Sequence, residues 1–164
     1  MKEVLPYLYV GSDADYEAIR DDADWSSVAC AKEPWHREAL GYTGRGAPRE
    51  HPEYLWVRRD RRLILNMVDA DRAAYFDPAM MDTALAFIEV ELDIGQKVLL
   101  HCNQGLSRAP GLALLYMFKH NHFVGMPYDV GETEFRNGHY PPFQPRPGIR
   151  EYVRTEWRRT CPGS

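Results

Sequence analysis

The chain has 164 residues, of which 45% are hydrophobic and 27% charged, and its formal net charge is −4. This length suffices for one globular domain with a sizeable core, but not for a second domain of any size. The acidic balance argues against a general nucleic-acid-binding surface, and no apolar run approaches the ~20 residues of a membrane-spanning helix.

Cysteine and histidine spacing gives no metal site. Cys30, Cys102 and Cys161 match neither a metal-binding spacing nor an even disulfide framework. His120 and His122 form a His-x-His pair, but no further ligands lie at suitable spacing, so neither a metal nor a cofactor is expected. Residues 1–11 lack the basic start and long apolar core of a signal peptide. We therefore expect a reducing, cytoplasmic location without membrane contact.

The first elements in chain order are a strand, a short helix and a second strand. Val4 to Gly11 alternates in polarity as a strand does, and a short helix follows from about Ala14 to Arg20. A second strand is predicted around Ser27–Cys30.

The next segment, residues 33–53, is the least regular part of the sequence because prolines and glycines interrupt it repeatedly. From residue 32 to 62 there are eight basic and five acidic residues, a local balance of +3 in an acidic protein. Two interpretations stay open: a solvated surface loop, or a rim that contacts a partner. The side chains available to such a rim are Trp35, His36, Tyr42 and Arg45.

Two strands and a helix follow. Tyr54–Val57 and Leu63–Val68 are predicted strands joined by a charged turn, and the second, nearly continuous apolar run is typical of a central strand. This strand leads into Asp69 and Asp71. Residues 78–95 are predicted to form a helix with an apolar stripe, which Asp77 caps at the start and Gly95 ends.

The most informative stretch is Lys97–Leu112, which runs KVLLHCNQGLSRAPGL. A short apolar strand leads into His101 and Cys102, a polar turn with one glycine follows, and after Arg108 an apolar helix is predicted from Pro110 to about Lys119. The pattern is a strand, a loop with Cys-x5-Arg spacing, and a helix.

This pattern suits anion binding and nucleophilic chemistry. Backbone N–H groups of such a loop, together with the helix dipole, create a positive field that holds a phosphate. The same field favours a thiolate, so Cys102 is predicted to be a nucleophile. The Arg108 guanidinium offers a planar fork to two oxygens, and Gly105 permits the tight turn. The alternative is an inert buried cysteine beside a surface arginine.

The string His-Cys-x-x-Gly-x-Ser-Arg resembles the signature loop of the cysteine-dependent protein tyrosine phosphatases, and most closely their dual-specificity branch. The resemblance implies that Cys102 takes the phosphoryl group, that Arg108 clamps it, and that His101 orients the loop. It also implies that backbone amides bind the phosphate oxygens, and these come from Asn103, Gln104, Gly105, Leu106, Ser107 and Arg108. In this branch the chain passes residues 33–53 more briefly, so that segment is interpreted as a loop insertion.

Such an enzyme also needs a general acid, because the leaving oxygen must receive a proton. The family places this aspartate on a loop roughly thirty residues before the cysteine. Counting back from the helix at Ala86-Phe87-Ile88 favours Asp71, whereas the end of the preceding strand favours Asp69. Both stay candidates, with a preference for Asp69.

One position departs from the family pattern. Members commonly carry Ser or Thr directly after the arginine, where the hydroxyl helps the cysteine to leave, but this chain has Ala109. Ser107 stands on the other side of Arg108 and is not assumed to replace that hydroxyl. We therefore expect slow breakdown of the phosphocysteine intermediate.

The C-terminal part is predicted to contain two helices, about Tyr128–Asn137 and Gly148–Arg159, joined by the proline-rich segment 140–147. The position of that segment between two helices favours an ordered loop over a polyproline ligand for a partner. The order of helix, proline turn and tryptophan-bearing final helix again resembles the dual-specificity phosphatases, as does the opening Leu5–Ser12.

Together these elements predict a single α/β domain, residues 1–164, with a mixed, largely parallel sheet flanked by helices. The implied function is a phosphomonoester hydrolase that acts on a phosphorylated protein through a phosphocysteine. Three alternatives remain: a phosphate-recognising pseudophosphatase, a phosphatase of phosphoinositides or RNA 5′-phosphates, and a sulfurtransferase, which fits the string less well. No nucleic-acid or membrane partner is expected, and the oligomeric state is open.

Overall fold

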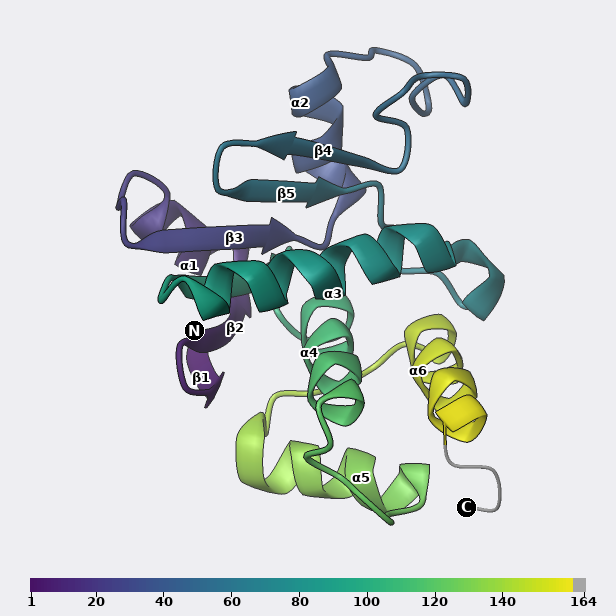
Figure 1. Ribbon diagram of the computed structural model, residues 1–164. Coiled ribbons are helices and arrows are strands. Elements are labelled where there is room, and N and C mark those ends of the chain that lie inside the picture. Colours follow the sequence, from purple (N-terminus) through teal and green to yellow (C-terminus); the bar gives the residue numbers. More distant parts are fainter. Residues whose placement is uncertain (161–164) are drawn as a thin grey trace.

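Six strands form one sheet in the computed structural model, which describes residues 1–160 and so leaves Cys161 outside (Figure 1). The strand order is β1-β2-β6-β3-β5-β4, with four parallel central strands and an antiparallel strand at each edge. The strands are β1 (Lys2–Leu5), β2 (Leu8–Ser12), β3 (Trp25–Ala29), β4 (Trp56–Arg59), β5 (Arg62–Leu65) and β6 (Lys97–Cys102). The predicted α/β domain with a mixed, largely parallel sheet is confirmed.

Helices cover both faces of this sheet. In Figure 1, α3 (Pro78–Asp93) and α4 (Arg108–Lys119) lie in front of it, and α1 (Asp13–Ile19) and α2 (Arg37–Leu40) lie behind. The remaining helical segments are η1 (Lys32–His36), η2 (Ala73–Tyr75), α5 (Tyr128–Glu134), η3 (Phe135–His139) and α6 (Pro147–Thr160). In the described part of the chain, no helix is both long and apolar enough to cross a membrane.

The central strand β6 determines where a site can form. Its residues Val98, Leu99 and Leu100 are fully buried because α3 and α4 pack on one side and α1 on the other. It pairs in parallel with β2, where Ser12 lies opposite Cys102, and with β3, where Ala29 lies opposite His101. The carboxyl ends of three parallel strands therefore meet at Cys102, which is where open α/β sheets bind ligands.

The N-terminal strand differs from the sequence prediction. Val4 to Gly11 was predicted as one strand, but the chain forms the antiparallel hairpin β1–β2. Pro6 lacks the N–H that a central ladder needs, and Tyr7 adopts a left-handed φ of 66°. The turn at Pro6-Tyr7 therefore divides the alternating run in two.

The segment 33–53, predicted to be irregular, begins with helical turns. η1 and α2 occupy residues 32–40, and the chain becomes irregular only after Gly41, whose φ of 73° ends α2. His36 is completely buried and lies 3.1 Å from the Glu53 carbonyl, so its ring joins the two ends of the segment. A buried polar anchor of this kind leaves no periodic signal in a sequence.

The strands on either side of the charged turn are also placed differently. The predicted turn from Arg58 to Arg62 shrinks to Asp60-Arg61, with Asp60 at a φ of 49°, and the flanking arginines lie within β4 and β5. β5 ends at Leu65, three residues before the predicted end. Beyond it the Asn66 N–H donates to the Leu55 carbonyl.

The predicted helices are present with small shifts. α3 starts at Pro78 with Asp77 as its cap, whose carboxylate accepts from the Ala79 N–H at 2.9 Å, and Gly95 follows its end with a φ of 82°. α4 begins at Arg108, two residues before the predicted start, so the arginine belongs to the first helical turn. The first C-terminal helix is split into α5 and η3.

Candidate active site

The loop between β6 and α4 depends on a close approach to β2. Gly105 has a φ of 70°, and a Cβ atom there would lie 2.7 Å from the Gly11 carbonyl oxygen. Only glycine fits both constraints. The loop is thereby pressed against the end of the neighbouring parallel strand.

The loop carbonyls face outward, toward the proline-rich segment. The Tyr140 hydroxyl donates to the Gly105 carbonyl at 3.0 Å, and the Gln144 N–H donates to the Leu106 carbonyl at 2.8 Å. In a trans peptide the N–H points opposite to the C=O, so the amides of Leu106 and Ser107 point toward the loop interior. Two amides of the loop are therefore directed inward, the orientation that favours an anion.

A pocket of about 260 Å³ opens at this loop. Its lining residues are Asp69, Cys102, Asn103, Gln104, Leu106, Ser107 and Arg108. Cys102 is only 2% exposed, and the pocket is its opening to solvent. All the loop residues predicted from the sequence, apart from Gly105, therefore line one small cavity.

Two hydrogen bonds hold the Arg108 guanidinium and leave its Nε–H group without a partner in the described residues. One terminal nitrogen donates to the Asn103 side-chain oxygen at 2.6 Å and the other to the Met67 carbonyl at 3.3 Å. Its Nε is buried and has no hydrogen-bond partner within residues 1–160. A buried donor without a partner costs free energy, so this N–H is available to an anion in the pocket.

Asp13, at the start of α1, organises the polar groups behind the loop. Its carboxylate accepts from Trp35 Nε1 at 2.8 Å and from Asn103 Nδ2 at 2.8 Å, and lies 3.0 Å from His101 Nδ1. Burial alone raises the pKa of Asp13, but the hydrogen bonds from His101, Trp35 and Asn103 outweigh it and hold that pKa below its usual value. Asp13 thus connects His101 to Asn103, which in turn holds Arg108.

His101 lies beneath the loop in an aromatic enclosure. It is fully buried, stacks on Tyr16 with ring centroids 4.4 Å apart, and meets the edge of Trp35 at 5.5 Å. Burial lowers the pKa of His101 despite the neighbouring Asp13 carboxylate. The neutral ring then carries its proton on Nδ1, toward Asp13.

The two candidate acids occupy different environments. Asp69 lines the pocket and accepts from the Ser107 hydroxyl at 2.9 Å. Asp71 is exposed, and its side chain pairs with Arg146 at 3.0 Å. The structure therefore brings Asp69, and not Asp71, to the cysteine loop.

The residues on either side of Arg108 show whether another hydroxyl can replace the one that Ala109 lacks. Ala109 is completely buried in the first turn of α4. Ser107 accepts from the Arg146 backbone N–H at 3.0 Å and donates its single proton to Asp69. The Ser107 hydroxyl proton is thus committed to Asp69 and does not replace the hydroxyl that Ala109 lacks.

Sequence reasoning missed Asp13 and Tyr140. Asp13 follows the end of β2, and since β2 and β6 are parallel neighbours their ends meet, so the pairing of these strands was the signal for its location. Tyr140 was placed in a connecting segment with no predicted contact. It lies 35 residues from Gly105, and no local pattern indicates a contact at that separation.

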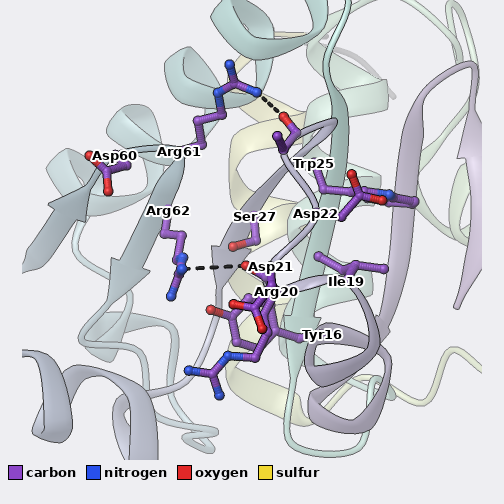
Figure 2. Close-up of a pocket in the computed structure, with 11 residues that line it drawn as sticks. Tyr16, Ile19, Arg20, Asp21, Asp22, Trp25, Ser27, Asp60, Arg61 and Arg62 are labelled. Atoms are coloured by element: carbon purple, nitrogen blue, oxygen red, sulfur yellow. Dashed lines mark hydrogen bonds between the residues drawn. The ribbon is translucent and has the colours of Figure 1, made fainter.

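A second hollow of about 360 Å³ lies at the N-terminal ends of β3 and β5 (Figure 2). Arg20, Asp21 and Asp22 face Asp60, Arg61 and Arg62 across it. No residue of the loop 101–108 lines this hollow, and its charges of both signs offset one another. A substitution in this hollow can therefore serve as a control for substitutions near the cysteine loop.

Comparisons with known proteins agree with this geometry. No protein-family model matches the chain. Human dual specificity protein phosphatase 5 is 26% identical over 132 residues, a match that covers 74% of this chain and 27% of that protein. The chain therefore corresponds to little more than a quarter of the length of this relative.

Solved structures match over nearly the whole chain. Human DUSP28 is 16% identical with a TM-score of 0.64 and covers 100% of both chains. A human tyrosine phosphatase-like serine/threonine/tyrosine-interacting protein is 20% identical with a TM-score of 0.62, covering 98% of this chain and 96% of that chain. The tyrosine phosphatase OH1 from Orf virus is 12% identical with a TM-score of 0.59, covering 96% and 86%. The chain therefore has the fold of the protein tyrosine phosphatases, and the resemblance of its sequence to their dual-specificity branch is confirmed.

Proposed function

We propose that this chain is a protein phosphatase that hydrolyses phosphotyrosine, and phosphoserine or phosphothreonine as well, through a phosphocysteine and without a metal cofactor. The observation that carries the proposal is the pocket in which the Cys102 thiol, the Arg108 guanidinium and the Asp69 carboxyl meet. Within the described residues, the buried Arg108 Nε has no partner and is free to bind a phosphate oxygen.

In the first step, the Cys102 thiolate attacks phosphorus and the bond to the substrate oxygen breaks. The loop amides and Arg108 hold the three phosphoryl oxygens, while the Asp69 carboxyl gives its proton to the leaving oxygen. The products of this step are the dephosphorylated substrate, a phosphocysteine and the Asp69 carboxylate.

In the second step, the Asp69 carboxylate takes a proton from water as that water attacks phosphorus. The phosphorus–sulfur bond breaks, and the thiolate and inorganic phosphate are released. The hydrogen bond from Ser107 to Asp69 fixes the carboxyl at the pocket for both steps. Because residue 109 is alanine, no hydroxyl at that position stabilises the leaving thiolate, and this step is proposed to be slow.

The substrate is proposed to be a phosphorylated protein. The loop side chains of Asn103, Gln104 and Leu106 are uncharged, which argues against the highly anionic phosphoinositides and RNA 5′-phosphates. A catalytic thiolate needs a reducing compartment, so the cytoplasm is the proposed location.

A second candidate function is phosphate recognition without turnover, and Ala109 is the observation that favours it. The structural neighbour described as a tyrosine phosphatase-like interacting protein carries a similar fold. In this case the pocket binds a phosphorylated partner, and the phosphocysteine either does not form or does not break down.

The test is the pre-steady-state release of p-nitrophenol from p-nitrophenyl phosphate in the presence of a chelator. We expect a rapid burst of one p-nitrophenol per active site and then slower steady release, with both phases absent from Cys102→Ser. Release equal to that of Cys102→Ser, while vanadate or phosphate still binds, contradicts the phosphatase and favours recognition alone. Cyanide-dependent consumption of thiosulfate tests the sulfurtransferase alternative.

A further inference from the structure

A groove of about 510 Å³ lies beside the phosphate pocket. Its lining comes from three segments, residues 46–55, 66–68 and 74–80, together with Lys32. Gly46, Ala47 and Arg49 of the first segment belong to the predicted insertion, and the site described above uses none of the groove residues.

The groove and the phosphate pocket share one piece of backbone. The Met67 carbonyl accepts from the Lys32 N–H at 2.8 Å and from the Arg108 guanidinium at 3.3 Å. Val68 lines the groove, and the next residue, Asp69, lines the phosphate pocket. Consecutive residues of one segment therefore line the two cavities.

The groove is preformed, because hydrogen bonds fix its lining segments to one another. The Asn66 side chain donates to the Tyr54 carbonyl at 2.9 Å, and its backbone N–H donates to the Leu55 carbonyl at the same distance. The Lys32 ammonium donates to the Arg45 carbonyl. Binding of a ligand here therefore requires little free energy to order the groove.

The charges available in the groove are positive. Arg37 of α2 and Arg59 of β4 are neutralised by bidentate pairs with Glu33 and Glu53. Arg49 is exposed, and no ion pair or hydrogen bond of its side chain is found within residues 1–160.

The one acidic lining residue is Asp77, whose carboxylate accepts the Ala79 N–H at the start of α3. The Lys32 side chain is only 20% exposed and lies 3.9 Å from the Glu33 carboxylate, so among the described groove residues Arg49 is the cation available to a ligand, in a chain that carries −4 overall.

Apolar side chains accompany this cation. Tyr75 is 60% exposed and Val68 is 37% exposed, and both line the groove. Exposed apolar side chains beside a charged site are typical of a surface that contacts a polypeptide.

We propose that this groove receives the segment of the substrate protein that flanks the phosphorylated residue, and that an acidic side chain in this segment pairs with Arg49. This inference rests on the proposed function, since it names the substrate of the same pocket: a phosphoresidue in an acidic sequence. Apolar neighbours of the phosphoresidue contact Val68 and Tyr75.

The test measures binding, so that it does not depend on turnover. Cys102→Ser in the full chain is titrated with fluorescein-labelled phosphotyrosine peptides that carry two aspartates, two alanines or two lysines on each side of the phosphotyrosine. We expect the aspartate peptide to bind about threefold more tightly than the alanine peptide at low salt, the effect of one exposed cation.

Reversing the charge of Arg49 gives the sharper result. Arg49→Glu, added to Cys102→Ser, is expected to remove most of that preference and to strengthen binding of the lysine peptide. The control is Arg20→Glu, an arginine that is also exposed but lies at the second hollow and pairs with Glu17, and it is expected to leave the ratio of the two affinities unchanged (Figure 2).

Equal binding of the aspartate and alanine peptides, or an unchanged preference in Arg49→Glu, overturns the inference. A 5′-phosphorylated RNA that binds more tightly than the aspartate peptide, and loses this advantage in Arg49→Glu, overturns the assignment to a protein segment. Failure of the proposed function is distinguishable from both, because it is the absence of Cys102-dependent hydrolysis while the aspartate peptide still binds with its preference.

Discussion

The Asp69 side chain, proposed as the general acid, lines the pocket of the cysteine loop, and a single residue separates it from the alternative Asp71. Asp69 lines the phosphate pocket and is fixed by Ser107, whereas Asp71 faces solvent with Arg146. In a regular extended segment residues i and i+2 point to the same side, so the separation of Asp69 from Asp71 reflects the bend that the chain makes at Asp71 and Arg72.

Asp69→Asn is expected to lower kcat/KM, which reports the step that expels the leaving group, by about 100-fold for a phosphotyrosine peptide, the lower end of what a general acid contributes. The loss should be smaller with p-nitrophenyl phosphate, because p-nitrophenolate leaves readily without a proton. Asp71→Asn removes only an exposed ion pair and should change kcat/KM by less than about twofold. Steady-state kinetics on both substrates check this. Equal losses in the two variants would show that Asp69 is not the acid.

Ala109 is the second position at which a single side chain is expected to set a rate, here that of phosphocysteine breakdown. A hydroxyl donating to the leaving thiolate is worth about 1.4 kcal/mol, so Ala109→Ser is expected to accelerate phosphocysteine breakdown about tenfold. The steady rate should rise and the burst should shrink relative to it. An unchanged burst and an unchanged steady rate, measured by stopped flow, would contradict the assignment of slow breakdown to Ala109.

At the scale of elements, the proline-rich segment 140–147 holds the cysteine loop from outside. It contacts the carbonyls of Gly105 and Leu106 and the hydroxyl of Ser107. The prediction of an ordered loop is confirmed. A segment that connects two helices therefore also keeps the loop amides directed inward.

Tyr140→Phe tests this support. Burial, with the nearby Cys102 and Asp15, raises the pKa of Tyr140 to about 12, so its hydroxyl is a donor at every working pH. Loss of this hydroxyl should lower the free energy of unfolding by about 1 kcal/mol. It should also raise KM, because the Gly105 carbonyl loses the hydrogen bond that fixes the loop. The control is Tyr152→Phe, a similarly buried tyrosine that packs on Phe76 away from the loop and should leave KM unchanged. Equal KM values for Tyr140→Phe and the unsubstituted chain would refute the supporting role.

At the scale of the whole molecule, two buried histidines couple folding to pH. Burial lowers the pKa of His36 and of His101 in the folded chain, against weaker opposing effects of Glu53 and Asp13. Below the unfolded value of about 6.5 the unfolded chain binds protons that the folded chain does not, so stability falls as pH decreases.

The urea midpoint is therefore expected to be constant above about pH 7 and to decrease between about pH 6.5 and 5. His36→Gln should make this decrease smaller, because one of the two histidines no longer contributes. Urea titrations of both chains at pH 7.5 and 5.5 check it. A urea midpoint that rises on acidification would contradict the predicted direction of the pH dependence. An equal decrease in both chains would show that His36 does not contribute to it.

Much of the fold and of the loop was predictable from the sequence, because the relevant interactions are local. The apolar run 98–100 fixes a buried strand, Gly105 fixes the turn, and the capped helix at Asp77 and Gly95 carries its own start and stop signals. Where local signals were ambiguous, as at Pro6-Tyr7 and in residues 33–40, tertiary contacts decided the result.

By itself, then, the sequence determined the strand, the Cys102–Arg108 loop, the helix that follows it and the type of sheet around them. Only the tertiary structure decided that Asp69 and not Asp71 faces the pocket, that Asp13 connects His101 to Asn103, and that segment 46–55 lines a positive groove beside Asp69. The physical reason is separation along the chain: Asp13 lies 88 residues from His101. Such pairs meet through strand order and loop packing, which leave no periodic trace in the sequence.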